Sequence, residues 1–395
     1  MRHLAFIGEA ESARLFHRLP EPLATDSPPE LLAAALGGTL YSPGTRTSLA
    51  QDVRKQARRG CVSMVLCLED SIADSDVEFA ERNVAGALRS LAEDRDIREL
   101  PLLFVRVRTP QQMRRLADLA GPGIDLLSGF VLPKFLKDPG LADQFFDALH
   151  DIHREYDQAG GRAGARRLRV MPILESPEMM HAETRSSALA GIAEVVRANR
   201  DDVLALRIGA TDLGSAYGLR RSRDLTVYDV KVLSAVIADI VNVLGRPEDD
   251  FVITGPVWEH YDSTERILRP QLRLTPFVDA NEKELRQRLM LKGLDGLIRE
   301  ITLDQANGLL GKTVIHPTHV PVVHALSVVS HEEFLDAQTI AADVGGGAAA
   351  SPYRNKMNEM KPHQTWARKT LLRARAFGVA AEHATFVDVL EASMR

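Results

Sequence analysis

Short apolar runs alternate along the chain with longer segments whose apolar residues recur at helical spacing. Most runs are rich in Val, Ile and Leu and are followed by polar residues, the pattern of a strand buried on both faces. Such strands, separated by helices, form a parallel sheet covered by helices. We predict strands at residues 38–43, 62–68, 102–107, 130–133, 170–174, 203–208, 251–256 and 313–315. Eight of them in this length favour an α/β fold of the closed TIM (β/α)8 barrel type over an open sheet.

Capping patterns mark several of the predicted helix starts. Thr109 is followed by Pro110 and Gln112, which combines a capping hydroxyl, a proline in the first turn and a glutamine three residues after the cap. The helix after Thr226 carries an apolar stripe that ends at Gly245. Further starts with a related or a Ser-Pro pattern are predicted at residues 75–78, 176–177, 302–305 and 330–333.

The two ends of the chain fall outside the alternation. Residues 1–37 contain a proline-rich stretch and are predicted to be an N-terminal extension of a barrel at residues 38–330. Residues 331–395 are predicted to form a C-terminal helical cap or lid. Glycines at 345–347 would serve as its hinge, because glycine restricts the backbone least.

Composition excludes some classes of function. The net charge is −5 and the pI is near 6.2, which argues against a nucleic-acid-binding protein with its clustered positive charge. No segment reaches the length of a membrane span, and Glu9 and Glu11 interrupt the stretch that a secretory signal would need. Cys61 and Cys67 lie six apart on one apolar run and are predicted to be reduced, buried thiols. We therefore predict a cytoplasmic protein without a nucleic-acid or membrane partner.

The residues that follow the predicted strands are unusually polar. In TIM barrels these residues face the active site, because the loops after the strands build that rim. Two or three of them could be helix caps or bridges between strand and helix, but a full ring is hard to explain structurally. The polar exits are Arg46, Glu69, Asp70, Arg106, Lys134, Glu175, Asp212 and His316, with residues 254–259 at the seventh strand.

Glu175 and Asp212 close two consecutive apolar runs. Carboxylates on neighbouring strand exits can hold one hard divalent cation, which prefers oxygen ligands and keeps several waters, so that one or two carboxylates are enough. We predict that both are metal ligands, with Mg²⁺ as the expected ion and Mn²⁺ as the alternative. Glu69 is predicted to support the metal from its outer shell.

Arg106, between Val105 and Val107, offers a fixed fork of donors to a substrate carboxylate or a developing enolate oxygen. The alternative is a bridge from Arg106 to Glu69 or Asp70, and the two roles are compatible.

Lys134 could form a Schiff base if burial depressed its pKa, or it could anchor a carboxylate. The two neighbouring acids favour its protonated form and therefore the second role. His316 stands beside a rigid proline and is predicted to be structural or supporting.

A set of motifs in this order resembles the HpcH/HpaI aldolase and citrate lyase beta-subunit family. The resemblance covers residues 38 to 330, and the order and strand placement of the motifs make the set specific. They are LYSPGTR at 40–46, LEDS at 68–71, FVRV at 104–107, LPK at 132–134, ILE at 173–175, IGATDL at 208–213 and VIHP at 314–317.

The resemblance implies a Mg²⁺-binding TIM barrel that makes or breaks carbon–carbon bonds next to a carboxylate. It assigns the metal to Glu175 and Asp212, substrate contact to Arg106 and the supporting acid to Glu69. Arg46 would bind substrate from the first strand loop, and Pro256 and Trp258 from the seventh. The implied reaction is an aldol or Claisen-type cleavage, or its reverse, on a small 2-oxo or carboxylic acid. Members of the family are usually homo-oligomers, often built from trimers.

Four further motifs resemble one branch, carbon–carbon bond lyases encoded near tellurium-resistance and stress genes, for which biosynthesis of a small metabolite is proposed. They lie at residues 217–221, 226–229, 253–259 and 356–363. The Trp258–Glu259 loop and the polar C-terminal segment depart from acyl-CoA lyases, which makes a CoA thioester substrate doubtful.

Several alternatives stay open at this point. No general base stands out in the barrel, and Glu359 or His363 could supply one if the C-terminal segment folds over the rim of its own or a neighbouring barrel. The same segment could equally be a solvated helix start. A metal-free Schiff-base aldolase using Lys134 is a second reading of the site. A catalytically silent barrel within a larger complex is a third.

Overall fold

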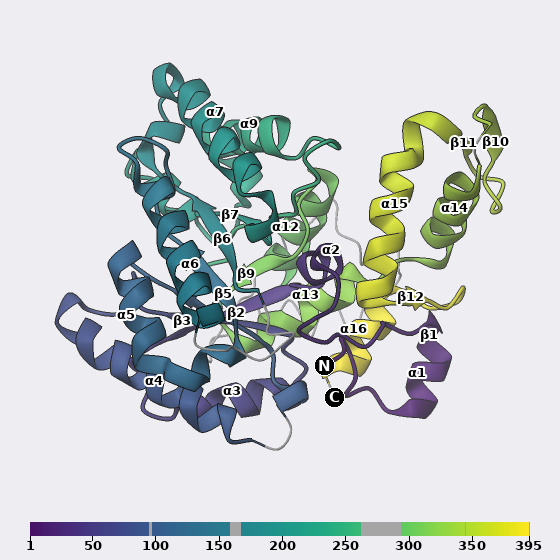
Figure 1. The fold of residues 1–395 in the computed structure, drawn as a ribbon. Coiled ribbons are helices and arrows are strands. Elements are labelled where there is room, and N and C mark those ends of the chain that lie inside the picture. The colour runs from purple at the N-terminus through teal and green to yellow at the C-terminus, as the bar shows by residue number, and fades with distance from the viewer. Residues whose placement is uncertain (95–96, 159–166, 262–293, 344, 395) are drawn as a thin grey trace.

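The computed structural model describes residues 1–94, 97–158, 167–261, 294–343 and 345–394. Within these ranges eight strands form one parallel sheet: β2 Gly38–Pro43, β3 Ser63–Cys67, β4 Leu102–Arg106, β5 Leu127–Leu132, β6 Arg169–Leu174, β7 Leu206–Ile208, β8 Ile253–Thr254 and β9 Lys312–Val314. Their order is β8-β7-β6-β5-β4-β3-β2-β9. A parallel bridge between Gly255 and Lys312 joins the two end strands, so the sheet closes and the predicted TIM barrel is confirmed (Figure 1).

The predicted strands differ from the observed ones mainly at their ends. β7 begins at Leu206 instead of residue 203, and β8 is confined to Ile253 and Thr254. The chain before these strands still pairs with its neighbours, since the amide of Leu204 donates to the carbonyl of Val170 at 2.9 Å. The regular ladder is therefore shorter than the apolar run that predicted it.

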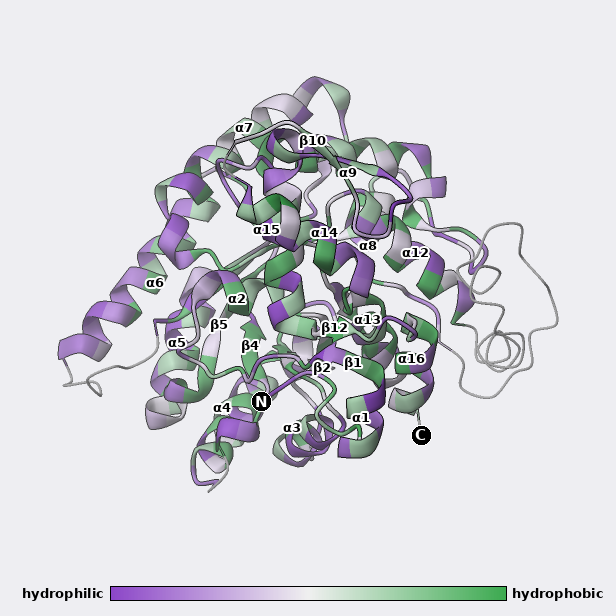
Figure 2. Cartoon of the chain, turned by 90° about the vertical axis from the view of Figure 1, so that its right-hand side faces the viewer, coloured by the Kyte–Doolittle hydropathy of each residue, from purple (hydrophilic) through white to green (hydrophobic). Residues whose placement is uncertain are grey.

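Two apolar layers hold the barrel together. The lumen is filled by buried side chains that include Val65, Phe104, Val131 and Met171. A larger cluster lies between the strands and the surrounding helices. These helices are α3 Leu49–Arg58, α4 Val77–Ala92, α5 Pro110–Ala120, α6 Leu141–Gln158, α7 Ala182–Ala198, α8 Ala210–Ser215, α9 Lys231–Leu244, α12 Asp295–Ala306 and α13 Val320–Ser327. They carry hydrophilic and hydrophobic residues along their length, as surface helices do (Figure 2).

Helix α2 (Pro29–Ala34) closes the N-terminal end of the barrel. Its Leu32 and Ala33 belong to the lumen cluster, together with Leu102 at the start of β4 and Leu204 just before β7. The polar strand exits lie at the other end. The barrel therefore has an apolar, plugged end and a polar mouth.

The C-terminal segment contains α14 (His331–Ala342), α15 (Met360–Phe377) and α16 (Phe386–Met394), with strands β10 (Ala348–Ala350), β11 (Met357–Glu359) and β12 (Val379–Ala380). α15 packs on α2 and α14, and β12 pairs antiparallel with β1 (Phe16–Arg18), which follows α1 (Glu9–Leu15). Figure 1 shows α14, α15 and the β10–β11 hairpin standing beside the barrel. The segment is thus attached at the plugged end of its own barrel, away from the mouth, and closure over a neighbouring barrel stays a prediction.

The helix starts confirm some of the predicted caps and correct others. The Thr109 side chain accepts from the amide of Gln112, and Ser330 forms a capping box with Glu333. The start predicted at Thr302 is wrong, because α12 already begins at Asp295 and the Thr302 hydroxyl donates to the carbonyl of Ile298 within the helix.

Two more starts are displaced, since the predicted Ser75 and Ser176 stand at 3-10 turns and cap no α-helix. The 3-10 turns are η1 Asp74–Asp76, η2 Ile97–Glu99, η3 Gly121–Leu126, η4 Pro177–Met179, η5 Arg200–Asp202, η6 Val227–Asp229 and η7 Pro317–His319.

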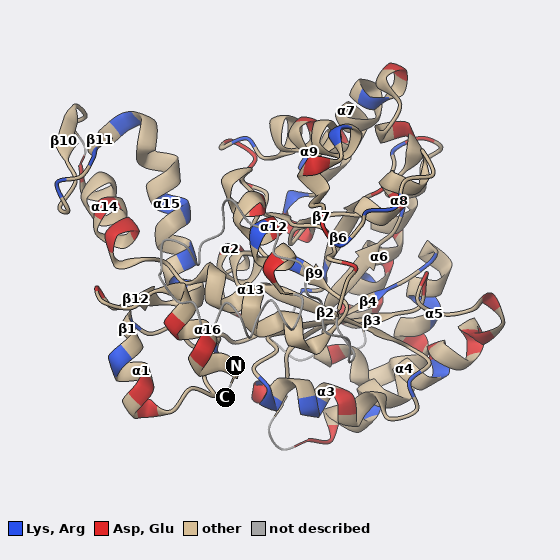
Figure 3. Cartoon of the chain, turned by 180° about the vertical axis from the view of Figure 1, so that it is seen from behind, with Lys and Arg blue, Asp and Glu red and all other residues tan. Residues whose placement is uncertain are grey.

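Charged residues of both signs are spread over the helices, and neither sign gathers in Figure 3. No helix in the described residues is long and apolar enough to span a bilayer. Cys61 and Cys67 are both free and buried, as predicted.

Candidate active site

Arg106, the last residue of β4, lies at the centre of a cluster of carboxylates at the mouth. Its Nη2 is 2.8 Å from Glu69 Oε2 and 3.0 Å from Glu175 Oε1. The same nitrogen is 3.2 Å from Asp70 Oδ2, so the predicted bridge to the two acids after β3 is present. Burial opposes the charge of Arg106, but the Glu175 and Glu69 carboxylates outweigh it and raise its pKa. Arg106 therefore stays charged at the bottom of the mouth.

Lys134 follows β5 and has a left-handed backbone conformation, with a φ of 47°. This conformation is uncommon for residues with a Cβ and occurs at functional sites. It directs the Lys134 amide to Glu175 Oε1 at 3.0 Å, while the ammonium donates to Glu69 Oε1 at 2.6 Å. Burial alone would lower the pKa of Lys134, but the hydrogen bond and charge of Glu69 raise it. A protonated lysine disfavours Schiff-base chemistry, because that reaction needs the neutral amine.

Glu175, directly after β6, is 2% exposed. Gly209, just after β7, makes room for it, since a Cβ at this position would stand 2.3 Å from Glu175 Oε2. Burial raises the pKa of Glu175 to about 7; Arg106 opposes this rise and Asp212 adds to it. Glycine at position 209 thus leaves space for Glu175 Oε2, while Oε1 accepts hydrogen bonds from Arg106 and from the Lys134 amide.

Asp212 stands in the first turn of α8 and is half-buried. Its charge acts on both Glu175 and Lys134, which places it beside the cluster. Its carboxylate makes no hydrogen bond or ion pair with the described residues. Asp212 is therefore a carboxylate at the mouth that the described chain leaves without a partner.

The donor set fits a hard divalent ion. No group of three or more His, Cys, Asp or Glu residues arranged to hold a metal occurs in the described residues. A closed, fully protein-ligated site such as structural zinc is therefore not formed by them. Glu175 and Asp212 do fit Mg²⁺, which keeps several waters and takes further oxygens from a substrate.

Other predicted site residues have contacts outside this cluster. Arg46 is exposed, and its Nε donates to Asp52 Oδ2 at 2.6 Å. His316 stacks on Tyr261 with 4.8 Å between ring centroids, and its Nδ1 lies 2.7 Å from Thr318 Oγ1. Substrate binding by Arg46 stays a prediction.

The seventh strand exit is buried. Pro256 is buried, and Trp258 is 1% exposed and belongs to the apolar layer between barrel and helices. Arg221 lies over the Trp258 ring at 5.9 Å from its centroid, and a Cβ on Gly296 would stand 2.7 Å from that ring. The Trp258 side chain thus fixes the loop against the outer layer, and substrate contact by Pro256 and Trp258 stays a prediction.

A second network of buried charges lies in the barrel wall. Lys312 on β9 is fully buried, and its Nζ donates to Glu300 Oε1 at 2.9 Å and to Asp304 Oδ2 at 2.7 Å. Glu300 also pairs with Arg221, and Asp304 accepts from the Tyr228 hydroxyl at 2.8 Å. This network ties β9 to α12 and to the loop after β7, outside the mouth.

Sequence reasoning overlooked Tyr41 on β2 and Arg207 on β7, which lie beneath the carboxylate cluster. The Arg207 guanidinium lies 5.5 Å from the centroid of the Tyr41 ring, and burial raises the pKa of Tyr41. The available signal was a charged residue in the middle of an otherwise apolar strand run.

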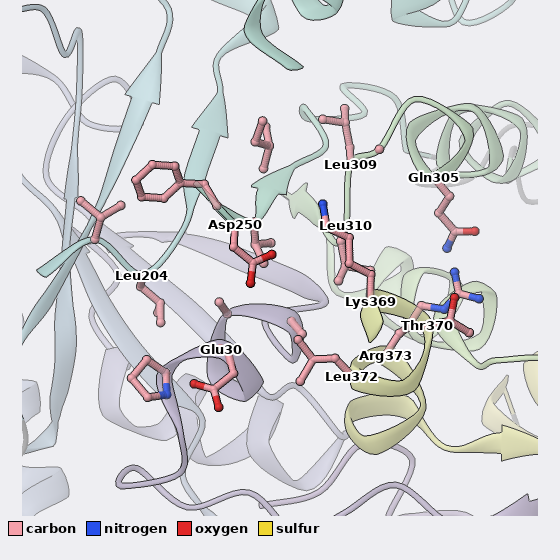
Figure 4. Close-up of a pocket in the computed structure, with 18 of the residues that line it drawn as sticks. Glu30, Leu204, Asp250, Gln305, Leu309, Leu310, Lys369, Thr370, Leu372 and Arg373 are labelled. Atoms are coloured by element: carbon pink, nitrogen blue, oxygen red, sulfur yellow. The ribbon is translucent and has the colours of Figure 1, made fainter. Parts of the chain in front are cut away.

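A cavity of about 940 Å³ lies at the plugged end. Apolar side chains such as Leu204 and Leu372 line it together with charges of both signs, including Glu30, Asp250 and Lys369 (Figure 4). No predicted site residue belongs to its lining. The predicted site residues therefore lie at the opposite end of the barrel from this cavity.

The fold and the mouth together define a class of protein, a TIM barrel whose rim joins paired carboxylates to an arginine and a lysine. The family model described as C–C bond lyase of the TIM-barrel fold matches residues 30–379. The chain belongs to this family and is a carbon–carbon bond lyase. The resemblance found in the sequence is thereby confirmed at the level of the family.

Two solved structures illustrate the similarity. Protein CitE from Mycobacterium tuberculosis, in complex with magnesium, acetoacetate and coenzyme A, is 20% identical with a TM-score of 0.51, over 87% of this chain and 99% of that chain. A citrate lyase from Burkholderia xenovorans LB400 is 16% identical with a TM-score of 0.60, over 96% and 98% of the two chains. At these identities they show a shared fold. No curated protein matches the chain.

Proposed function

We propose that the protein is a Mg²⁺-dependent lyase that cleaves or forms a carbon–carbon bond in a small 2-oxo or related carboxylic acid. One observation carries the proposal. Glu175 is fixed by Arg106 and the Lys134 amide, while the neighbouring Asp212 carboxylate has no partner in the described residues. Two such carboxylates can bind Mg²⁺, which fills its remaining coordination positions with water and substrate oxygens.

Glu175 and Asp212 would hold the ion, and bound there Mg²⁺ would act as a Lewis acid that stabilises negative charge on substrate oxygens. Arg106 would bind the substrate carboxylate or the enolate oxygen through its guanidinium. Lys134, kept protonated by Glu69, would donate to the same anionic fragment. Glu69 touches both cations and would orient them.

The position of the C-terminal segment supports a homo-oligomer. In this chain α15 packs on the plugged end, so Glu359 and His363 lie on a segment that is remote from their own mouth. We propose that a neighbouring subunit's segment covers the mouth and brings these residues as candidates for the general base. Light scattering should show an oligomer, and the double substitution Glu359→Gln and His363→Gln should abolish activity without removing Mg²⁺ binding.

The substrate is proposed to be a free acid. The CitE structure contains coenzyme A, but Trp258 is packed into the outer layer in this chain. The motifs at 217–221 and 356–363 support the branch proposed to serve small-metabolite biosynthesis. Thermal-shift titrations should show no stabilisation by coenzyme A.

The proposed function can be tested without knowing the full substrate, by measuring whether the protein stabilises the enolate of pyruvate. Pyruvate in D₂O should exchange its methyl protons when the protein and Mg²⁺ are both present, which proton NMR follows directly. Glu175→Gln should abolish the exchange, and Glu178→Gln, at an exposed acid three residues on, should retain it. Exchange that is independent of Mg²⁺, or a borohydride-trapped adduct on Lys134, would favour the Schiff-base alternative instead.

A further inference from the structure

Glu259 stands at the rim of the mouth, on the loop that follows β8. Its side chain is partly buried, and its Oε1 accepts a hydrogen bond from the Thr211 hydroxyl at 2.5 Å. Thr211 directly precedes Asp212 in the first turn of α8. This contact joins the exits of the paired strands β7 and β8, and it places the Glu259 carboxylate beside the helix that carries a proposed metal ligand.

The backbone just before Glu259 is held at two points. The Trp258 side chain is 1% exposed and packs in the outer apolar layer. The carbonyl of Val257 accepts from Arg221 Nη2 at 2.7 Å, and Arg221 Nη1 pairs with the fully buried Glu300. Glu259 is therefore presented by a fixed loop, and a functional side chain needs such support to keep its geometry.

Glu259 differs in its partners from the acids that follow β3 and β6. Those acids all pair with Arg106, and they are Glu69, Asp70 and Glu175. A nearby positive charge favours the carboxylate form of an acid and makes it a weaker base. Glu259 has no cationic partner among the described residues, and Thr211 donates to one of its oxygens. Within the described chain its second oxygen is therefore available to accept a proton.

The proposed reaction needs a group that moves a proton at carbon. Enolate formation removes a proton from the carbon beside the carbonyl, and a general base must lie within reach of that proton. Arg106 and Lys134 cannot accept it, since neighbouring carboxylates raise their pKa values. The Nδ1 of His316 is already engaged at 2.7 Å from Thr318 Oγ1. Glu259 combines an accepting oxygen with a fixed position, as a general base requires.

We propose that Glu259 is a catalytic residue that transfers the proton at the carbon beside the substrate carbonyl. The inference rests on the proposed function and adds to it the residue that forms and quenches the enolate. In pyruvate the Glu259 carboxylate takes a proton from the methyl carbon, and the electron pair of that C–H bond forms the carbon–carbon double bond of the enolate. The carbonyl oxygen takes the negative charge, which Arg106 shares. In the cleavage direction protonated Glu259 returns a proton to the enolate carbon, while Glu359 or His363 of a neighbouring subunit stays the candidate for the base at the substrate hydroxyl.

The test follows proton exchange of pyruvate in D₂O by NMR, with full-length protein and Mg²⁺. Glu259→Gln should slow the exchange by about 100-fold or more, because amide cannot take the proton and general acid–base catalysis contributes at least that factor. Glu259→Asp should retain part of the rate, since it keeps a carboxylate on a shorter side chain. The matched control is Glu248→Gln, at an exposed glutamate in the turn before β8, which should keep the wild-type rate.

Binding measurements separate a catalytic role from a structural one. Oxalate is a stable anion that resembles the enolate of pyruvate in shape and charge. Calorimetry should show that Glu259→Gln binds Mg²⁺ with less than a twofold change and oxalate at least as tightly as the wild type, and its melting temperature should be unchanged. A variant that loses oxalate binding and melting temperature together with the exchange would overturn the proposal, because Glu259 would then be structural.

Failure of this role is distinguishable from failure of the proposed function. A wild type that neither binds Mg²⁺ nor exchanges the methyl protons of pyruvate would overturn the proposed function and the role of Glu259 with it. Mg²⁺-dependent exchange that persists at the wild-type rate in Glu259→Gln would overturn the role of Glu259 alone. Loss of that exchange in His316→Gln in its place would assign the proton transfer to the histidine.

Discussion

Two buried cations on opposite faces of the same barrel wall differ in how completely the chain satisfies them. Lys312 on β9 faces α12 and has two carboxylate partners, which are themselves engaged by Arg221 and Tyr228. Arg207 on β7 faces the lumen and has hydroxyl contacts but no carboxylate in the described residues. A buried charge with complete partners stabilises the fold, whereas a buried charge without a counter-charge is expected to contribute little or nothing to stability.

The largest expected effect separates the two cations by stability. Lys312→Met should lower the free energy of unfolding by about 3–5 kcal/mol, because it leaves two buried carboxylates without their counter-charge. Arg207→Met should leave it unchanged or raise it, since it removes an unpaired buried charge. Urea denaturation followed by circular dichroism measures both. An equal loss of unfolding free energy in Lys312→Met and Arg207→Met would contradict this difference between the two cations.

The charges at the mouth are only partly paired within the chain. Glu69 is the carboxylate that pairs with both cations there, Arg106 and Lys134. Glu69→Gln keeps the shape but weakens the hold on Arg106 and Lys134. Loss of such a supporting partner typically lowers metal affinity or activity 10–100-fold. We expect the Mg²⁺-dependent pyruvate exchange rate to fall by about that factor while stability changes little. An unchanged rate would show that Glu69 has no part in orienting the site.

The smallest effect concerns pH. Burial raises the pKa of Glu175 from 4.5 to about 7, so in metal-free protein the carboxyl holds a proton below that pH. Mg²⁺ needs the carboxylate and must displace this proton. Its affinity should therefore rise up to about tenfold per unit as the pH increases toward 7, and level off above it. Calorimetry between pH 6 and 8 measures this slope, and a flat profile would mean that Glu175 is not a ligand.

The sequence predicted the strands and most of the carboxylate cluster, but it did not predict the buried Arg207. Apolar runs that end in polar residues placed the strands, and strand exits meet at one rim, so Glu69, Arg106, Lys134 and Glu175 came together as expected. Arg207 was overlooked because a run that is apolar on both faces does not say which residues face the lumen.

Other misses have local causes. A Thr-x-x-Gln spacing also fits inside a helix, so Thr302 did not start one. The place of the C-terminal segment depends on packing between α15 and α2, which are far apart in sequence and carry no pairing pattern.

Titration of the full-length protein with Mg²⁺ in a calorimeter tests the central claim most directly. The account predicts one ion per chain for the wild type and for Glu178→Ala, and no binding for Glu175→Ala or Asp212→Ala, with all variants folded. Wild-type affinity in Glu175→Ala would contradict it, because the ion would then be held by other residues.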